Sequence, residues 1–319
     1  MAILHVEHLK KYFETPQGLL HAVDDVSFDI EEKKTLGLVG ESGCGKSTLG
    51  RLLLHLLDNS GGKIVFEGED ISQVEEKHRR LLCKRMQMIF QDPFSSIDPR
   101  KTVMQTISEP LIVFKMGTRA EIDKKVAEIM DLVGISQRIR NAYPHELDGG
   151  RRQRVGIARA LILNPRFIVC DEPVSALDVS IQAQIINLML ELQETLGLTY
   201  VFITHDMSVV RHVSHDILVM YLGQAVESSN CDDLFKQPLH PYTQALMSAV
   251  PVPDIDRPLN RLILTGEITS PINPKPGCRF AARCRYAKER CFQENPAAEE
   301  ILPGHKVACH YVAEINAIG

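Results

Sequence analysis

One segment of the chain has the residue types and the spacing needed to hold phosphate groups. Residues 40–47 read Gly-Glu-Ser-Gly-Cys-Gly-Lys-Ser, which fits G-x-x-x-x-G-K-[S/T] between an expected strand at 35–40 and an expected helix from residue 46. Its glycines let backbone N–H groups surround phosphate oxygens, Lys46 reaches the β- and γ-phosphates, and Ser47 can ligate Mg²⁺. A chance glycine-rich turn is the alternative. The pattern predicts a nucleotide site made of Gly40, Ser42, Gly43, Cys44, Gly45, Lys46, Ser47 and Thr48.

A second segment places two carboxylates at the end of a buried strand. Residues 167–170 are apolar, and Asp171 and Glu172 follow them directly. The carboxyl edge of a parallel sheet is where α/β proteins bind ligands, so Asp171 can hold Mg²⁺ through water. Glu172 can orient or deprotonate the water that attacks the γ-phosphate. Carboxylates that simply cap the next helix are the alternative.

The elements around these segments predict an α/β fold. Strands are expected at 3–9, 26–30, 35–40, 86–90, 166–170, 199–204 and 215–223, and helices at 46–57 and 181–196. Strands that alternate with helices imply a mostly parallel sheet with helices on both faces. A helical insert is expected at about 92–150, where Thr118 and Glu121 form a capping box and Gly134 ends the helix.

Composition limits the function classes. The chain has 319 residues, 44% hydrophobic and 24% charged, with a net charge of −5 and no block of Lys and Arg. Nucleic-acid binding is therefore disfavoured. No apolar run reaches the roughly 18 residues that span a bilayer, and the N-terminus lacks the layout of a signal peptide, so a cytoplasmic protein is expected.

The most specific segment is Leu147-Asp148-Gly149-Gly150-Arg151, which is followed by Arg-Gln-Arg and then Val-Gly-Ile-Ala-Arg-Ala-Leu. It resembles the LSGGQ signature of ABC ATPases, a family of P-loop NTPases with a RecA-like core, an antiparallel β part and a helical subdomain. The resemblance implies an ATP-hydrolysing motor in which two subunits meet head to tail. Each ATP then lies between the phosphate loop of one chain and the signature segment of the other.

The resemblance also assigns roles to residues that a single pattern would not. It implies that Tyr12 stacks on adenine, that Gln91 senses the γ-phosphate and ligates Mg²⁺, that Asp178 belongs to the D-loop, and that His205 is the switch histidine. Glu172 and His205 become the catalytic pair, and Ser47, Gln91 and Asp171 the Mg²⁺ ligands. Residues 92–100 are then expected to dock on the coupling helix of a membrane channel.

Asp148 departs from the family pattern, which has serine there, and Arg151 replaces its glutamine. A serine hydroxyl can donate a hydrogen bond to the γ-phosphate, whereas a carboxylate repels it unless it is protonated or is shielded by Mg²⁺ or an arginine. We therefore hypothesise a heterodimer with two unequal ATP sites.

Four of the eight cysteines lie close together near the C-terminus, at Cys278, Cys284, Cys291 and Cys309, with spacings x5, x6 and x17. Zinc sites usually contain C-x2-C pairs, although four thiolates can bind zinc, and they can equally hold a [4Fe–4S] cluster. Disulfides are disfavoured in a reducing cytosol, and four reduced structural cysteines are a further alternative.

The C-terminal segment from about residue 236 is rich in proline and resembles the tail of dipeptide and oligopeptide importer ATPases, part of which nickel importers share. The resemblance implies an ABC nucleotide-binding domain at 1–245 and a Pro/Cys-rich extension at 246–319 that carries an iron–sulfur cluster in some members. A peripheral subunit is implied on the cytoplasmic face of the membrane, with two permeases and an external substrate-binding protein. A motor for nickel or another small solute, and a soluble ABC ATPase not coupled to transport, are the alternatives.

Overall fold

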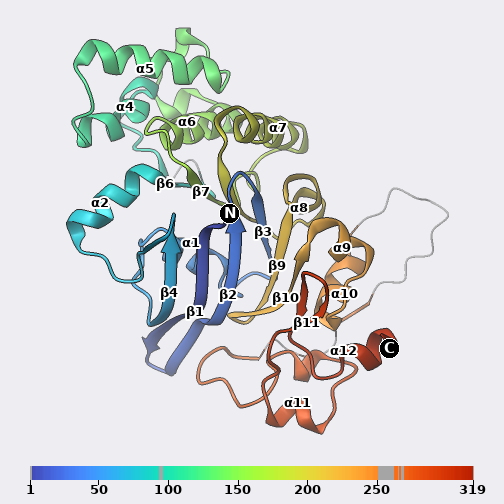
Figure 1. Cartoon of the computed structure of the whole chain (residues 1–319). Helices are drawn as coiled ribbons and strands as arrows, with labels where there is room; N and C mark the ends of the chain where they lie inside the picture. The colour runs from blue at the N-terminus through green and yellow to red at the C-terminus, as the bar shows by residue number, and fades with distance from the viewer. Residues whose placement is uncertain (1, 93–95, 251–261, 265, 267–268, 319) are drawn as a thin grey trace, which may run out of the picture. The chain divides into compact units, whose positions relative to one another are not determined.

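The computed structural model describes residues 2–92, 96–250, 262–264, 266 and 269–318. The chain divides into two compact units, Met1–Gln73 with Thr204–Gly319, and Val74–Ile203. In the described residues, no helix is long and apolar enough to cross a bilayer. Each unit is described in turn below (Figure 1).

The first unit contains an antiparallel sheet with the strand order β2-β1-β4-β5. It also contains a second set of strands that are hydrogen-bonded to one another in the order β11-β12-β10-β9-β3. β3 and β9 are parallel, whereas β9–β10, β10–β12 and β11–β12 are antiparallel. Its strands are β1 (Ala2–Thr15), β2 (Gly18–Glu31), β3 (Thr35–Val39), β4 (Gly61–Phe66), β5 (Glu69–Asp70), β9 (Asp216–Tyr221), β10 (Gln224–Asn230), β11 (Glu299–Leu302) and β12 (His305–Val307).

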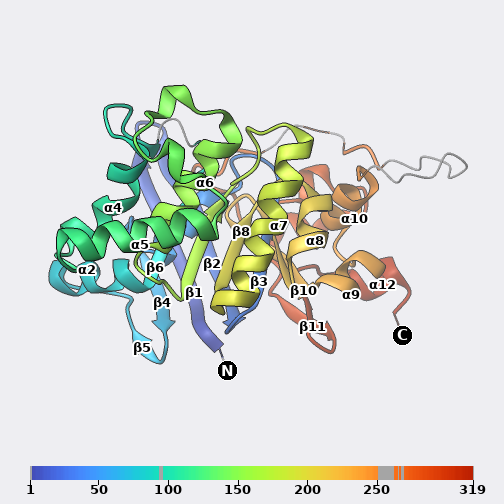
Figure 2. The same cartoon turned by 90° about the horizontal axis from the view of Figure 1, so that it is seen from above.

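Helices cover this unit on the side of β3, β9 and β10, where α8 and α9 pack (Figure 2). The helices are α1 (Lys46–Leu53), α8 (Met207–Val213), α9 (Cys231–Lys236), α10 (Pro241–Ser248), η3 (Ala281–Arg283), α11 (Glu289–Gln293) and α12 (Val312–Asn316). Phe280 of the extension belongs to the same hydrophobic core as Tyr221 of β9 and Tyr242 of α10. The centroid of its ring lies 5.2 Å from that of Tyr221, edge-on, and 5.5 Å from that of Tyr242.

The second unit contains the parallel strands β6 (Met86–Ile89), β7 (Phe167–Asp171) and β8 (Thr199–Ile203) in the order β8-β7-β6. Helices α4, α5 and α6 pack together above them in Figure 1, and α7 packs on α6. The helices are α2 (Glu76–Arg85), α4 (Val103–Val113), α5 (Arg119–Leu132), η1 (Gln137–Ile139), η2 (Pro144–Glu146), α6 (Gly149–Leu161) and α7 (Val179–Leu196).

Most sequence-based elements are confirmed. The capping box of α5 forms as expected, with Thr118 and Glu121 bonding each other's backbone, and Gly197 ends α7 in the left-handed region. Helix α1 is shorter than predicted: it ends at Leu53 because His55 adopts a left-handed φ of 53°. Gly61 and Gly62 begin β4, a strand that the sequence analysis did not predict.

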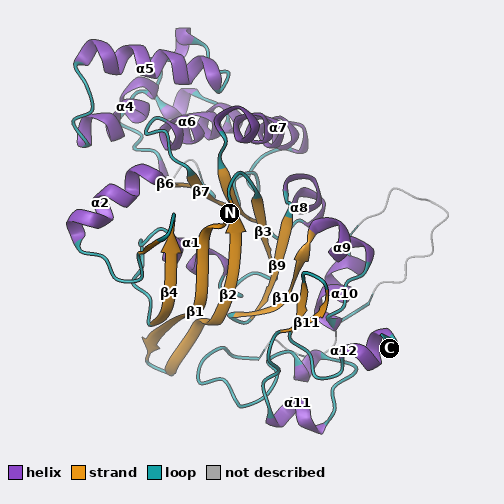
Figure 3. Cartoon of the chain, in the orientation of Figure 1, coloured by secondary structure: helices purple, strands orange, loops and turns teal. Residues whose placement is uncertain are grey.

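The segment after residue 236 is more ordered than its sequence suggested. Figure 3 shows long loops there, but α10, α11 and α12 form and β12 pairs with β10. The expected helical insert at 92–150 contains α4, α5, η1 and η2, whereas residues 93–95 of the expected docking surface lie outside the described residues.

Candidate functional site

The phosphate-binding loop joins β3 to α1, and close backbone contacts explain its glycines. Gly45 has a φ of 103°, and a Cβ there would lie 2.1 Å from the carbonyl oxygen of Ala22. Gly40 has a φ of 151°, and its Cβ would lie 2.2 Å from the carbonyl oxygen of Met220. Only glycine can occupy both positions without moving the backbone. The loop is therefore shaped by strands β2 and β9 as well as by its own sequence.

Lys46 is held inside this loop. Its side chain is 5% exposed, and Nζ donates to the carbonyl oxygens of Gly40 at 2.8 Å and Glu41 at 2.9 Å. Ser47 and Thr48 follow in the first turn of α1 and are half-buried, whereas Ser42 and Gly43 are exposed at the tip of the loop. Burial raises the pKa of the Cys44 thiol, so this cysteine stays protonated at neutral pH.

Tyr12 lies on β1 with its ring 4.1 Å from that of His21, at an interplanar angle of 31°. Its hydroxyl donates to Oδ1 of Asp24, and burial together with this carboxylate raises the pKa of Tyr12. Burial alone would raise the pKa of Asp24, but hydrogen bonds from Tyr12 and His21 and the charge of Arg279 lower it overall. The phenol of Tyr12 is thus fixed by a charged partner.

In the second unit, two residues predicted separately are brought together. Gln91 follows β6, and its Nε2 donates to Oε2 of Glu172 at 2.9 Å. Glu172 follows the buried Asp171 at the end of β7 and has a left-handed φ of 45°, while its N–H donates to the carbonyl of Ile203 at 2.9 Å. A non-glycine residue in this region costs about 1–3 kcal/mol. The backbone conformation of Glu172 therefore sets the direction of its carboxylate, and the side-chain amide of Gln91 holds that carboxylate by a hydrogen bond.

Two other residues expected at the phosphate site lie at the starts of helices, His205 in the first unit and Asp178 in the second. His205 is exposed, comes two residues after β8 in the chain and directly precedes Asp206, the N-cap of α8. Asp178 is the exposed N-cap residue of α7 and makes no side-chain bond to the start of that helix. Ser47 belongs to the first unit, whereas Gln91 and Asp171 belong to the second.

Asp148 has a structural role that the sequence comparison did not suggest. It is the N-cap of α6: its Oδ1 accepts a hydrogen bond from the backbone N–H of Arg151 at 2.7 Å, and the guanidinium of Arg151 lies 3.4 Å from Oδ2. Serine and aspartate are both preferred N-caps. The substitution therefore keeps the helix start, and Arg151 supplies a positive charge beside the carboxylate.

The two glycines after Asp148 allow α6 to approach the D-loop and α7. A Cβ on Gly149 would lie 3.1 Å from Cδ2 of Leu177, and one on Gly150 would lie 2.7 Å from Cγ2 of Ile181. Leu147 before them is buried. The signature segment is thus packed closely against Leu177 and Ile181 of the same unit.

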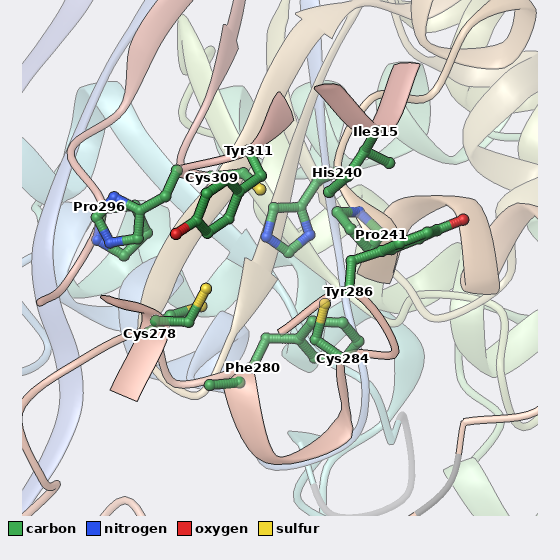
Figure 4. Close-up of a pocket in the computed structure, with 13 residues that line it drawn as sticks. His240, Pro241, Cys278, Phe280, Cys284, Tyr286, Pro296, Cys309, Tyr311 and Ile315 are labelled. Carbon is green, nitrogen blue, oxygen red and sulfur yellow. The ribbon is translucent and has the colours of Figure 1, made fainter. Parts of the chain in front are cut away.

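Cys278, Cys284, Cys291 and Cys309 line one small cavity with His240 and Tyr311, and all four are free thiols (Figure 4). The cavity volume is about 20 Å³, which is room for one water-sized group. Burial raises the pKa of Cys278 to about 11 and also raises those of Cys284 and Cys309, so a metal would have to displace protons to bind. Among the described residues, no group of three or more His, Cys, Asp or Glu side chains is arranged to hold a metal ion.

Comparison with known proteins identifies the family. Residues 23–175 match the model of the ABC transporter family, and residues 226–291 match that of the oligopeptide/dipeptide transporter C-terminal region. The oligopeptide transport ATP-binding protein AppF of Bacillus subtilis is 51% identical over 97% of both chains. The chain belongs to the ABC transporter ATPases.

Solved structures agree with this assignment. One ABC ATPase, an ATP-binding cassette solved as a dimer in a post-hydrolysis state with ADP and Pi, matches with a TM-score of 0.66 and 26% identity over 72% of this chain and 98% of its own. CbiO1 of Clostridium perfringens, part of an ABC transporter complex, matches with a TM-score of 0.66 and 29% identity over 74% of this chain and 91% of its own. The predicted fold and ATPase class are confirmed.

Sequence reasoning missed two arginines of the extension that pair with residues in or near the expected ATP-binding segments of this ABC ATPase. Arg283 pairs with Glu41 in the phosphate-binding loop, and Arg279 pairs with Asp24 beneath Tyr12. The partners are separated by 242 and 255 residues along the chain. No local pattern signals such pairs, although both arginines lie beside cysteines that the sequence had singled out.

Proposed function

We propose that this chain is the ATP-hydrolysing motor of an ABC importer for dipeptides and oligopeptides. The observation that carries the substrate class is the match of residues 226–291 to the C-terminal region of oligopeptide/dipeptide transporters, since this region lies outside the ATP-binding motifs. The name of AppF supports the same class. In this proposal the chain is a peripheral subunit on the cytoplasmic face of the membrane. It drives two permeases fed by an external binding protein and never contacts the peptide.

In this proposal residues 1–245 form the domain that binds and hydrolyses ATP, and this domain includes a helical subdomain at about 92–150. The extension at 246–319 has a separate role. Phosphates are held by the loop around Lys46, adenine stacks on Tyr12, and Mg²⁺ is held by Ser47, Gln91 and Asp171. Glu172 orients the attacking water and His205 contacts the γ-phosphate. The bond from Gln91 to Glu172 supports this assignment, because it holds the carboxylate in one orientation.

We further propose that the chain works in a nucleotide sandwich with a non-identical partner ATPase. The motivating observation remains Asp148 in the signature segment, although Arg151 beside it offsets part of its charge. Because the signature acts on the partner's ATP, the two sites would turn over unequally. Turnover of complexes that carry Asp148→Ser or Glu172→Gln tests this: an unchanged rate for Asp148→Ser, with a rate halved by Glu172→Gln, would remove the basis for unequal sites.

Reconstitution tests the transport function directly. The chain is combined with the permeases, the binding protein and the partner ATPase that co-purify with it from native membranes, and ATP turnover is measured in proteoliposomes with and without peptide. We expect peptide to stimulate turnover and to accumulate inside, and Lys46→Ala to abolish both. Stimulation by Ni²⁺ but not by peptide would instead favour the nickel importer, and absence of any co-purifying permease would favour a soluble ATPase.

We also propose that the four cysteines of the extension hold a [4Fe–4S] cluster. The support is that four free thiols from separate parts of the extension line one cavity, which is the donor set that such clusters use. The present volume suits a single ion better, so a cluster requires the thiols to move apart, and zinc remains the competing ligand.

Metal analysis separates these ligands. The full chain is reconstituted anaerobically, and iron, sulfide and zinc are measured per chain for the wild type, for Cys284→Ser and for the control Cys83→Ser, a half-buried cysteine of α2 outside the cavity. We expect about four iron and four sulfide in the wild type and in the control, as a [4Fe–4S] cluster requires, and a loss in Cys284→Ser. Zinc without sulfide would contradict the cluster.

A further inference from the structure

Arg283, in the turn before Cys284, reaches the phosphate-binding loop. Its Nη1 donates to Oε2 of Glu41 at 2.8 Å and its Nη2 to Oε1 at 3.1 Å, so the ion pair is bidentate. The side chains are 9% and 26% exposed. A bidentate pair that is mostly shielded from water is stronger and more directional than a surface ion pair. The extension is therefore attached to the second residue of this loop.

The backbone of Glu41 is also held by a C-terminal residue. The N–H of Glu41 donates to the hydroxyl of Tyr242 at 2.8 Å, and the guanidinium of Arg283 lies near Tyr221, to whose hydroxyl Nη1 donates at 3.3 Å. Lys46 Nζ in turn donates to the carbonyl oxygen of Glu41. Both the side chain and the main chain of Glu41 are thus fixed, by Arg283 and Tyr242, next to the lysine that is expected to bind phosphate.

The charge of Glu41 gives this contact an electrostatic consequence. A carboxylate in a loop that accepts a triphosphate repels that ligand, and repulsion between close charges of the same sign is stronger where water is partly excluded. Arg283 neutralises this carboxylate over hydrogen-bond distance. Without Arg283, the loop would present an uncompensated negative charge to ATP.

A second arginine of the extension acts at the other end of the expected ATP site. Arg279, beside Cys278, is 7% exposed at its side chain, and its Nη2 pairs with Oδ2 of Asp24, while its Nη1 donates to the carbonyl oxygen of Leu222. The other carboxylate oxygen of Asp24, Oδ1, accepts a hydrogen bond from the hydroxyl of Tyr12. Arg279 therefore fixes the carboxylate that orients the tyrosine.

We propose that Arg279 and Arg283 are positioning residues through which the Cys-rich extension sets the affinity of this chain for ATP. Arg283 acts through Glu41 on the phosphate-binding loop, and Arg279 acts through Asp24 on Tyr12. The inference rests on the proposed role of these two segments in ATP binding. It gives the extension a function in the ATPase reaction in addition to any role of its cysteines.

The test measures the Kd for Mg·ATP on the purified full-length chain, and KM and kcat on that chain assembled with its proposed partner ATPase. Arg283→Ala is expected to raise Kd and KM on the order of tenfold with little change in kcat, since the charge is lost at the binding step. Arg283→Lys keeps the charge but loses the bidentate geometry, so a smaller rise is expected. Arg285→Ala is the matched control, because this exposed arginine lies just beyond Cys284, with its guanidinium 5.0 Å from the ring centroid of Tyr286, and should leave Kd unchanged.

A double substitution distinguishes electrostatic positioning from simple attachment of the extension. Glu41→Gln removes the repelling charge, so Arg283→Ala added to Glu41→Gln should raise Kd by less than twofold. If Arg283→Ala lowers the melting temperature but leaves Kd unchanged, or if Kd rises equally in both backgrounds, the inference is wrong. A wild-type chain that binds Mg·ATP no better than Lys46→Ala would overturn the proposed function itself, which is a different outcome.

Discussion

Replacing Asp148 by alanine removes the hydrogen bond that the N–H of Arg151 donates over 2.7 Å and the ion pair at 3.4 Å. Loss of an N-cap aspartate costs a helix about 1 kcal/mol. The two side chains of the ion pair are 58% and 60% exposed, so that pair adds at most about 0.5 kcal/mol. Asp148→Ser keeps an oxygen at the cap position and should cost less than about 0.5 kcal/mol.

Hydrogen exchange at the first turn of α6 measures this effect locally, without requiring the whole chain to unfold in one step. A loss of about 1 kcal/mol corresponds to an exchange rate about fivefold faster for the amide of Arg151. Asp178→Ala is the matched control, because Asp178 occupies the same position before α7 but makes no side-chain bond to that helix. The exchange of α7 should therefore be unchanged in Asp178→Ala.

Equal acceleration in Asp148→Ser and Asp148→Ala would refute the capping explanation, as would an unchanged Arg151 amide in Asp148→Ala. Either result would mean that Asp148 does not stabilise the start of α6 and acts only near the nucleotide. The expected result instead makes serine and aspartate interchangeable for the fold, and ATP turnover of Asp148→Ser then reports only what the carboxylate does to the partner's ATP.

Three further outcomes follow from contacts in the first unit. Phe280→Ala should lower the free energy of unfolding in urea by about 3–5 kcal/mol, because its ring fills the space between Tyr221 and Tyr242. Gly45→Ala should weaken ATP binding far more than Gly43→Ala, measured as Kd, because a Cβ on Gly43 meets no atom within 4 Å. Burial lowers the pKa of His240 to about 4, from a usual value of 6.5. The unfolded chain therefore binds the extra proton between these values, and stability should fall by about 2.5 kcal/mol from pH 7 to pH 4.5, with a smaller fall in His240→Gln.

The glycine-rich loop after β3, strands β1–β3 and β6–β9, and the capped helix α5 could be predicted because each is encoded by neighbouring residues. Glycine spacing, apolar runs and the Thr118–Glu121 capping box are local signals. The early end of α1 could not be predicted, because its apolar pattern continues past the left-handed residue His55. Helix α10 was also missed, because the surrounding prolines mask its short pattern.

The sequence indicated which residues are candidates for the site, but it did not indicate which of them contact each other. The sequence singled out Gln91 and Glu172 separately, and their hydrogen bond depends on β6 and β7 lying side by side. The contacts of Arg283 and Arg279 depend on a loop region that returns to the N-terminal strands after more than two hundred residues. Tertiary structure alone determines such contacts.

The pairing of β12 with β10 has a practical consequence for shortened versions of this protein. Glu227 on β10 is buried, and its carboxylate pairs with His305 of β12 at 2.7 Å while accepting the N–H groups of Leu239 and His240. A chain cut after residue 245 would lose His305 and leave one edge of β10 open. Open strand edges recruit other chains, and a buried carboxylate that loses a hydrogen-bond partner is costly. An ATPase trimmed at its apparent domain boundary should therefore precipitate on expression, whereas one that retains the chain to residue 316 should stay in solution.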